Sequence, residues 1–291
     1  MNRPTLIILV GVPGAGKTYY AQNYLSNCQK LTFHSSSDAI RAELYGDEST
    51  QGNPIEVFSL MQERAVEALN NGCDVIYDST AMTRKDRAGI IAACPKFVKI
   101  EAHIIWAPIE TCIERDAARD RTVGKAVIDK MLKRFQAPYF DEGIDEIKII
   151  RPDKFDTVTY ERDIINDTYI PHDNPHHTLC VFDHCQETFE NVCCYSSNLD
   201  IHAAAAWHDI GKPYVKAFVD SKGEPCDTAH YYQHQNVGAY MSYGFEYITP
   251  HIAWLISSHM EPFMNTKYYR ALPPYLKKDI DILHKADVEA H

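Results

Sequence analysis

The sequence has 291 residues, of which 45% are hydrophobic and 24% charged, and its formal net charge is −11. This composition excludes a chain that is disordered as a whole, and the acidic balance argues against tight binding of duplex nucleic acid, which needs a basic footprint. The length favours two modest domains over one.

Charge and histidine are unequally distributed along the chain. Residues 1–155 contain 20 Lys+Arg and 21 Asp+Glu, whereas residues 156–291 contain 9 and 19. Twelve of the 14 histidines also lie in the second part. Because imidazoles and carboxylates are metal ligands, a metal site is expected there, while the first part could still offer a local basic cleft to a strand end.

The longest early apolar run, Leu6 to Val12, has seven residues, whereas a helix that spans a bilayer needs about 20. The nine cysteines include no CxxC pair, and we interpret them as reduced, mostly buried thiols. We therefore predict a cytoplasmic protein without a membrane partner. The sequence leaves the oligomeric state open.

Strand and helix patterns alternate through residues 1–155. An apolar run bounded by Pro4 and Gly11 predicts a buried strand at 5–10, followed by a helix at 17–28. Further strands are expected at 31–36, 73–80, 97–107 and 146–152, and further helices at 56–70, 109–119 and 128–138. This alternation is typical of an α/β domain with a doubly wound parallel sheet.

The pattern changes after about residue 155. Residues 156–171 are interpreted as a linker, because the polar, proline-containing stretch DTYIPHDNPHHT begins there. Residues 172–291 are expected to form an all-α domain without a strand pair. Its predicted helices are 179–194, 199–207, 233–243, 252–258 and 277–284.

The strongest motif is GVPGAGKT at residues 11–18, which matches GxxxxGK[ST] between a predicted strand and helix. Its glycines let successive backbone N–H groups point at phosphate oxygens, Lys17 would reach the β and γ phosphates, and Thr18 would ligate Mg²⁺. The NKxD element of GTPases is absent, so we predict a small ATP-dependent phosphotransferase. The expected ATP-binding residues are Gly11, Gly14, Ala15, Gly16, Lys17, Thr18 and Arg119.

Two acidic positions are candidates for the acceptor side of a kinase site. Asp38 and Arg41, three residues apart at the start of a predicted helix, share one helical face. A carboxylate there can take the proton of an attacking hydroxyl while a guanidinium holds a phosphate. Asp78 ends a predicted strand at the edge where ligands bind. The alternatives are an N-cap aspartate with an exposed arginine, and a turn aspartate.

A third candidate element is the arginine-rich stretch around residue 117. Arg115 and Arg119 are four residues apart on a predicted helix, and Arg121 follows. Such arginines would stabilise charge on the transferred phosphoryl group. The alternative is a solvated helix face paired with neighbouring acids.

Together, GVPGAGKT, DAIR, YDST and RDAAR resemble the kinase domain of phage-type polynucleotide 5′-kinases, over about half the chain. The resemblance implies that Asp38 is the general base for a 5′-hydroxyl and that Arg41 holds the phosphate of the acceptor. It also implies that Arg115 and Arg119 contact the donor phosphates.

The second part contains an ordered series of histidines and aspartates. Single histidines are more often structural, but a set in this order suits one or two ions of Mn, Ni, Co, Fe, Zn or Mg for attack on a phosphate ester. The candidate ligands are His184, His208, Asp209, His234, His259 and Asp287, with His177 and His230 in reserve.

This series resembles the HD phosphohydrolase superfamily over about residues 172–291, carried by NPHHTLCVFDHC and HDIGK. The resemblance implies metal-dependent phosphoester hydrolysis with Asp209 in the catalytic centre and Lys212 contacting substrate phosphate. Fusions of an HD domain and a polynucleotide kinase form a known type of end-healing enzyme, in which the HD domain comes first. In this sequence the order is reversed.

The leading hypothesis is a bifunctional end-healing enzyme that phosphorylates 5′-hydroxyl ends of RNA or DNA and removes 3′-phosphate or 2′,3′-cyclic phosphate, upstream of a ligase. A second hypothesis is a nucleoside or nucleotide kinase fused to a nucleotide phosphohydrolase, which the near-neutral first part favours. A third is a non-catalytic, ATP-gated sensor with a vestigial HD site.

Overall fold

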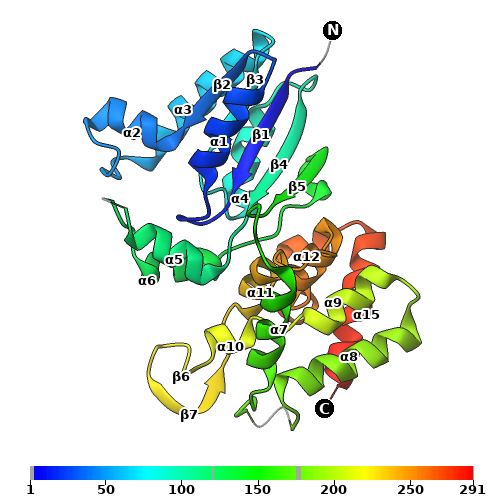
Figure 1. The fold of residues 1–291 in the computed structure, drawn as a ribbon. Coiled ribbons are helices and arrows are strands. Elements are labelled where there is room, and N and C mark those ends of the chain that lie inside the picture. Colours follow the sequence, from blue (N-terminus) through cyan, green and yellow to red (C-terminus); the bar gives the residue numbers. More distant parts are fainter. Residues whose placement is uncertain (1–2, 120, 175–177, 291) are drawn as a thin grey trace. The chain divides into compact units, whose positions relative to one another are not determined.

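The computed structural model describes residues 3–119, 121–174 and 178–290 (Figure 1). The chain divides into two compact units, and each is described separately below. The first comprises Met1–Met131 and Pro138–Asp153, and the second Leu132–Ala137 and Lys154–His291. Among the described residues, no helix is both long and apolar enough to cross a membrane.

The first unit is built on a parallel sheet with strand order β2-β3-β1-β4-β5. Each predicted strand is confirmed, β1 with the predicted bounds and the other four with slightly shorter ones. The strands are β1 (Thr5–Val10), β2 (Thr32–Ser36), β3 (Asp74–Asp78), β4 (Lys99–Ile105) and β5 (Glu146–Ile150). Because β1 and β3 are fully covered by their neighbours and by helices, their side chains are almost all buried. This is the predicted doubly wound sheet.

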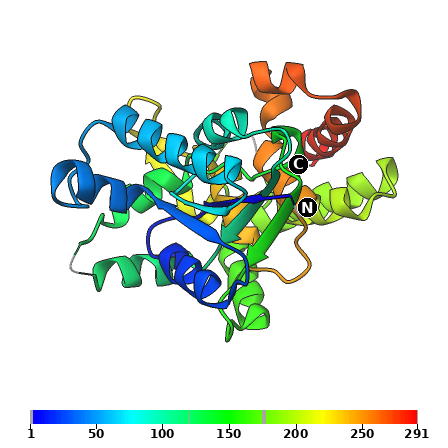
Figure 2. The same cartoon turned by 90° about the horizontal axis from the view of Figure 1, so that it is seen from above.

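Helices cover both faces of this sheet, with α1 on one side and α3 and α4 on the other (Figure 2). The apolar positions Val57, Met61, Ala65 and Leu69 of α3 recur at helical spacing and are buried. Phe58, next to Val57 on the same helix, is 39% exposed. The helices are α1 (Lys17–Asn27), α2 (Ser37–Tyr45), α3 (Pro54–Asn70), α4 (Arg84–Ala93), α5 (Ile109–Ala117) and α6 (Lys125–Leu132), with the 3-10 helix η1 (Phe140–Glu142).

The second unit is a helical bundle in which α8, α9, α11, α12 and α15 form the central packing. Leu276, Ile280, Leu283 and Ala286 give α15 a buried apolar stripe against α8, α9 and α12. Its helices are α7 (Thr157–Thr168), α8 (Val181–Tyr195), α9 (Leu199–Trp207), α10 (Lys212–Val215), α11 (His234–Ser242), α12 (Pro250–Ser258), α13 (Glu261–Met264), α14 (Lys267–Ala271) and α15 (Pro274–Glu289).

Two expectations for the second part need correction. The stretch 156–171, interpreted as a linker, contains α7, whose Ile164 and Thr168 are buried and whose Tyr160 ring packs against Phe245. Polar residues on its exposed side obscured this amphipathic helix. The unit also contains an antiparallel strand pair that was not predicted, β6 (Ala217–Val219) and β7 (Pro225–His230). These strands are short and mostly not buried, so they need no alternation of apolar and polar residues, which is the pattern that would have predicted them.

No disulfide joins any of the nine cysteines in this structure. The expectation that most are buried is wrong, since only Cys112 and Cys185 are buried. The small thiol side chain is tolerated at half-buried positions as well as in the core.

Candidate functional site

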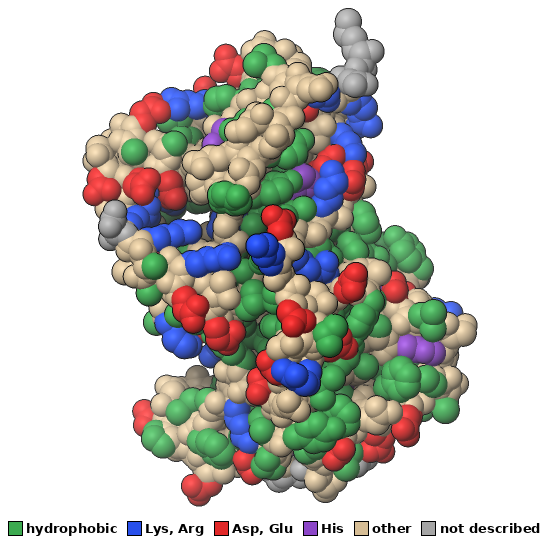
Figure 3. Space-filling view, viewed as in Figure 1, with side chains coloured by type: hydrophobic (Ala, Val, Ile, Leu, Met, Phe, Trp, Pro, Cys, Tyr) green, Lys and Arg blue, Asp and Glu red, His purple; other side chains and the backbone are tan. Residues whose placement is uncertain are grey.

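The carboxyl ends of β1, β2 and β3 open into a cleft of about 590 Å³ in the first unit. Strand register explains the convergence, because Ser36 at the end of β2 pairs with Asp78 at the end of β3. Lys and Arg side chains border the hollow between α2 and α5 (Figure 3). Among the residues lining the cleft are Gly14, Gly16, Lys17, Thr18, Asp38, Arg41, Phe58, Asp78, Arg119 and Arg121.

The loop at residues 11–18 has the backbone that the motif requires. Gly14 and Gly16 have φ angles of 81° and 103°, which favour glycine. A Cβ atom on Gly14 would lie 2.1 Å from the Cys112 carbonyl oxygen. The Lys17 ammonium donates to the carbonyls of Gly11 and Val12 at 2.9 and 3.1 Å, and burial lowers the pKa of Lys17. The lysine is therefore held over the loop where a phosphate would bind.

Helix α1, which begins at Lys17, is anchored to the sheet by a polar chain beneath it. The Tyr20 hydroxyl donates to His103 Nδ1 at 2.8 Å, and His103 Nε2–H donates to Glu101 at 2.9 Å. Glu101 also accepts from Lys99 and Lys148, each at 2.7 Å. Burial alone would raise the pKa of Glu101, but hydrogen bonds from these cations lower it to about 2. The ionised carboxylate thus fixes α1 through His103.

The two predicted acidic positions both face the cleft. The Arg41 guanidinium donates to Asp38 at 2.7 Å, and Arg121 lies 3.5 Å from the same carboxylate oxygen. Asp78 is 6% exposed and pairs with His34 Nε2 at 3.1 Å. His34 is a contact that sequence reasoning missed, although its place on β2, two residues before Ser36, sets it beside the end of β3.

The predicted arrangement of the arginines is only partly present. Helix α5 ends at Ala117, so Arg119 lies beyond the helix and does not share a helical face with Arg115. Arg119 and Arg121 line the cleft, whereas Arg115 is outside the lining, with Nη1 3.5 Å from the Gly14 carbonyl. The helix ends early because Asp116 turns inward and accepts from the Thr122 hydroxyl and two backbone N–H groups.

In the second unit, the six predicted ligands gather into two adjacent groups of three. Within each group, one ligand atom of every residue lies within 4.8 Å of the others. The groups are His184, His208 and Asp287, and Asp209, His234 and His259. All are buried except Asp287, whose side chain is 17% exposed. His208 and Asp209, adjacent in sequence, thus serve neighbouring groups.

Asp209 lies between the two groups. Its Oδ1 is 3.0 Å from His234 Nε2 and 3.9 Å from His259 Nε2. Its Oδ2 is 3.3 Å from His208 Nε2 and 3.5 Å from His184 Nε2. Among the described residues, His208 Nε2 and Asp209 Oδ1 are buried without a partner in hydrogen-bond geometry, while Asp209 Oδ2 lies 2.5 Å from the Lys212 ammonium. A carboxylate so placed can contact a cation in each group.

Backbone contacts fix the orientation of the imidazoles. The Nδ1–H groups of His208, His234 and His259 each donate at 2.8 Å to a carbonyl three residues earlier, those of Ala205, Tyr231 and Ile256. Each Nε2 therefore points inward, and in the neutral imidazole it carries the lone pair that a metal ion needs. The Nε2 atoms of His234 and His259 face each other at 3.2 Å, an arrangement that a shared cation stabilises. The donor set fits divalent metal ions.

Asp209 and His259 have protonation states that suit metal binding. Burial alone would lower the pKa of His208, but Asp209 and Asp287 raise it well above its usual value, so a metal ion would have to displace a proton there. Burial alone would raise the pKa of Asp209, but His208 and Lys212 hold it well below its usual range. Burial, with help from His208 and His234, lowers the pKa of His259 to about 3. Asp209 is thus ionised and His259 neutral at pH 7, as metal ligation requires.

Packing contacts between distant segments place these ligands. Asn191 of α8 donates to the Ala286 carbonyl at 3.2 Å, which sets α15, and hence Asp287, against α8. A Cβ atom on Gly211 would lie 2.1 Å from the His234 carbonyl oxygen and 2.6 Å from the Gly238 nitrogen. Glycine at 211 therefore lets α11 approach closely enough to bring His234 beside Asp209.

Lys212 adjoins the ligand groups, as predicted. Its hydrogen-bond partner, His172, was not predicted. The ammonium lies 2.5 Å from Asp209 Oδ2 and 3.1 Å from His172 Nε2. His172 is 1% exposed and its Nδ1–H donates to the Leu179 carbonyl at 2.8 Å, so Nε2 accepts from Lys212. The Tyr231 ring lies over the ammonium, 5.5 Å from its centroid.

Sequence reasoning missed His172 because it falls in the histidine-rich stretch that begins after the presumed linker. Of the reserve histidines, His230 ends β7 and stacks on Tyr232, apart from both ligand groups. His177 lies outside the described residues.

Solved structures with a detectable likeness include chains of two structures of the Pnkp1/Rnl/Hen1 complex, one described as an RNA repair complex. They are 21% and 22% identical, with TM-scores of 0.37 and 0.41, and cover 43% and 46% of this chain. The match spans less than half of those chains, 43% and 44%. A gluconokinase from Sinorhizobium meliloti is 16% identical with a TM-score of 0.37, covering 53% of this chain and 86% of its own.

No curated protein matches the sequence. Two family models do match it: residues 6–138 match the AAA domain and residues 181–288 match the HD domain. Both intervals agree with the geometry, since the first contains the phosphate loop and most of strands β1 to β4, with β5 beyond it, and the second contains all six clustered ligands. The chain therefore carries a P-loop domain of the AAA family followed by an HD domain.

Proposed function

We propose that the chain is a bifunctional nucleic-acid end-healing enzyme. Its first unit transfers the γ-phosphate of ATP to a 5′-hydroxyl end, and its second removes a 3′-phosphate or opens and removes a 2′,3′-cyclic phosphate. The observation that carries the proposal is the pairing, in one chain, of a P-loop cleft containing Asp38 and Arg41 with two ligand groups that meet at Asp209.

In the kinase cleft, the loop amides and Lys17 would bind the ATP phosphates and Thr18 would hold Mg²⁺. Asp38 is half-exposed, so an incoming hydroxyl can reach its carboxylate and lose a proton to it. Arg41 would hold the phosphate next to that hydroxyl, and Arg119 would stabilise charge on the transferred group. Asp78, buried at the strand end, would orient the acceptor or a Mg²⁺-bound water.

In the HD site, His184, His208 and Asp287 would hold one ion, and His234 and His259 a second, with Asp209 between them. Divalent ions bound there, drawn from Mn, Ni, Co, Fe, Zn or Mg, would supply charge stabilisation to phosphoester hydrolysis. Lys212 is directed at the same space and would bind a phosphate oxygen of the substrate. His172 would keep the lysine directed there.

The two activities are complementary, because a ligase needs a 5′-phosphate and a 3′-hydroxyl. An enzyme with both units would convert RNA or DNA ends that carry a 5′-hydroxyl and a 3′-phosphate or 2′,3′-cyclic phosphate into substrates for such a ligase. The proposed partners are therefore nucleic-acid ends and, downstream, a ligase.

The test is an oligonucleotide with a 5′-hydroxyl and a 2′,3′-cyclic phosphate, incubated with ATP and a panel of divalent ions. We expect a product with a 5′-phosphate and a free 3′ end. Asp38→Asn should remove the 5′ phosphorylation and leave the 3′ reaction intact. No transfer of labelled phosphate to the oligonucleotide, together with transfer to a mononucleoside, would refute the polynucleotide assignment.

That outcome would support a second candidate function, a nucleoside or nucleotide kinase joined to a nucleotide phosphohydrolase. A cleft of about 590 Å³ accommodates a single nucleoside beside ATP phosphates, and residues 1–155 are nearly neutral overall. The ratio of kcat/KM for a 5′-hydroxyl decanucleotide to that for the matching nucleoside separates the two. End healing predicts a ratio well above one.

A further inference from the structure

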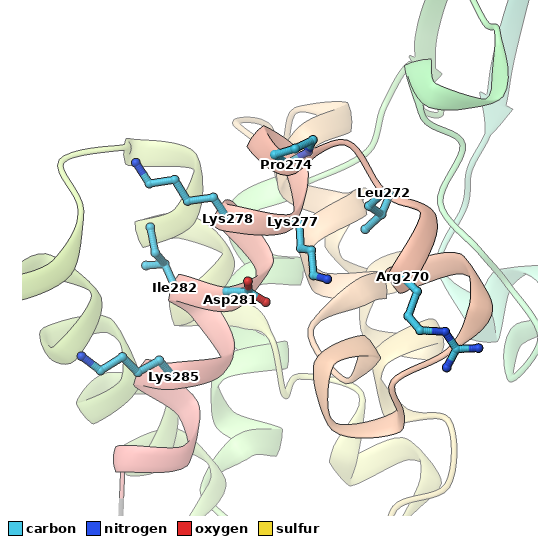
Figure 4. A pocket seen from close by; sticks show the side chains of 8 residues that line it. All are labelled: Arg270, Leu272, Pro274, Lys277, Lys278, Asp281, Ile282 and Lys285. Atoms are coloured by element: carbon cyan, nitrogen blue, oxygen red, sulfur yellow. The ribbon is translucent and has the colours of Figure 1, made fainter.

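A basic groove runs along the outer side of α15 (Figure 4). Arg270, Lys277, Lys278 and Lys285 line it, against a single carboxylate, Asp281. Lys278 and Lys285 are exposed and lie two helical turns apart, so they follow the same side of the helix over about 10 Å. The groove therefore presents a line of positive charge to solvent.

This concentration of cations is unusual for the unit that contains it. Residues 156–291 contain 9 Lys+Arg against 19 Asp+Glu, yet five of the nine cations fall between Lys267 and Lys285. Cations gathered on one face of an acidic domain form a local electrostatic footprint that the net charge conceals.

Aromatic side chains accompany the cations. The Lys277 ammonium lies 4.3 Å from the Tyr269 ring centroid, and the Lys285 ammonium 3.9 Å from that of Tyr195. Tyr275, in the first turn of α15, is 69% exposed. Tyrosines interleaved with lysines suit unpaired bases as well as phosphates, because every base can stack on an aromatic ring.

The nearby acids offset only part of this charge, since four cations and one carboxylate line the groove. Tyr269 donates its hydroxyl to Asp281, and Tyr195 donates to Glu289, so each of these carboxylates is held by a tyrosine. A Lys285–Glu289 pair spans 4.0 Å, at the limit of an ion pair. Asp279 faces another way, with His251 at 3.3 Å.

Helix α15 carries both the groove residues and Asp287, which belongs to one of the two ligand groups. Successive helical residues are rotated by about 100°, so Lys285 and Asp287 point to nearly opposite sides of α15. A strand whose 3′ end lay at the Asp287 side would have to cross about one helix width, roughly 10 Å, to reach the groove. A mononucleotide is too short to do so, whereas a strand of several nucleotides is long enough.

We infer that this groove binds the phosphodiester backbone of single-stranded nucleic acid whose 3′ end is in the HD site. The inference rests on the proposed function, since it supplies the polymer-binding surface that an end-healing phosphohydrolase needs. It makes the HD unit, despite its acidic charge, selective for polymer over mononucleotide.

The test measures binding of a fluorescent, 5′-phosphorylated single-stranded RNA of about 12 nucleotides to the full-length chain, without ATP or metal, at 50 and 200 mM salt. Lys278→Gln combined with Lys285→Gln should weaken binding about tenfold at the lower salt. The magnitude of the slope of log K against log salt should fall by about 1.4, or 0.7 per lost phosphate contact.

A matched double variant, Lys222→Gln with Arg162→Gln, removes two exposed charges from the same unit away from the groove and should bind like the parent. The single variant Lys278→Gln should give an intermediate affinity, which checks the result if the double variant unfolds. Equal binding by groove and control variants, or no RNA binding by the parent, would overturn the inference.

A third arm uses vesicles containing phosphatidylserine. Loss of vesicle binding in the groove variant with RNA binding retained would also overturn the inference, in favour of a membrane surface. Hydrolysis by the parent of a 2′,3′-cyclic phosphate at the 3′ end of the same RNA, with divalent ions added, is measured separately. Its absence counts against the proposed function, while the RNA-binding comparison remains decisive for the groove.

Discussion

The phosphate loop of the first unit and the ligand groups of the second differ in where their polar atoms come from. The loop consists of eight consecutive residues whose expected phosphate ligands are mainly backbone N–H groups, and Asp38, Arg119 and Arg121 around it are partly or fully exposed. The HD site uses six side chains from segments up to 103 residues apart, nearly all buried. The first depends on local backbone conformation, and the second on the packing of several helices.

This difference indicates how each site should respond to the substitution of a side chain. A local loop can lose a side chain and still fold, because its backbone is set by glycines and by the sheet. A buried cluster of charged side chains is coupled to its helices, so losing one ligand alters charge, metal binding and packing together. The four predictions below test this contrast, from the largest expected effect to the smallest.

The largest effect is expected for Asp209→Asn, because this carboxylate alone lies between both ligand groups. Hydrolysis of a cyclic phosphate should fall about 10³-fold or more, and bound metal measured by atomic emission should decrease. The kinase reaction should be unchanged. Asp227→Asn, at an exposed position on β7, is the control. Retained hydrolysis in the Asp209 variant would exclude the shared-carboxylate arrangement.

The reciprocal change is Lys17→Ala. Transfer of phosphate to a 5′-hydroxyl should fall about 10³-fold, since the ammonium that faces the transferred phosphate is lost, while thermal stability changes little. Phosphate release from the 3′ end should be unaffected. Lys96→Ala, exposed and outside the cleft, is the comparison variant. A parallel fall in both activities would mean that the two sites are not independent.

A smaller effect is expected for His172→Phe, which removes the acceptor of the Lys212 hydrogen bond but leaves every ligand in place. We expect a 10- to 100-fold loss, seen mainly as a higher KM for the phosphoester, with metal content unchanged. His172→Gln, which keeps an acceptor, should recover part of the loss. His230→Phe serves as the control. If the Phe variant instead loses metal, His172 acts on the ligand groups rather than on Lys212.

The smallest effect is a change in stability for Glu101→Gln. Unfolding free energy at pH 7 should fall by about 1–3 kcal/mol, since Lys99, Lys148 and His103 lose a charged acceptor. The folded-state pKa of Glu101 is depressed to about 2, below the unfolded value near 4.3. Its contribution is therefore present above pH 4 to 5 and is lost as pH falls toward 2.

Denaturant unfolding of the parent and Glu101→Gln between pH 7 and pH 2.5 measures this contribution. The two curves should converge at the acid end. A constant difference across the range would show that the carboxylate acts by packing and not by charge.

The sequence by itself determined the phosphate loop, the parallel sheet and the six candidate ligands that gather in the second unit. The loop is local, the strands are short apolar runs between turns, and the ligand types follow one another in a recognisable order. The sequence also singled out Asp38, at the start of a predicted helix, and Asp78, at the end of a predicted strand, while Lys212 followed from the resemblance to HD phosphohydrolases.

Only the tertiary structure decided which groups act together. It divided the ligands into two triplets, placed Arg119 and Arg121 rather than Arg115 at the cleft, converted the expected linker into α7, and set His172 against Lys212. These outcomes depend on where helices end and how closely they approach, as at Gly211, where a single methyl group would separate α11 from the Asp209 turn. Residue type and spacing fix local conformation, but the meeting of side chains 40 to 100 residues apart is fixed by packing.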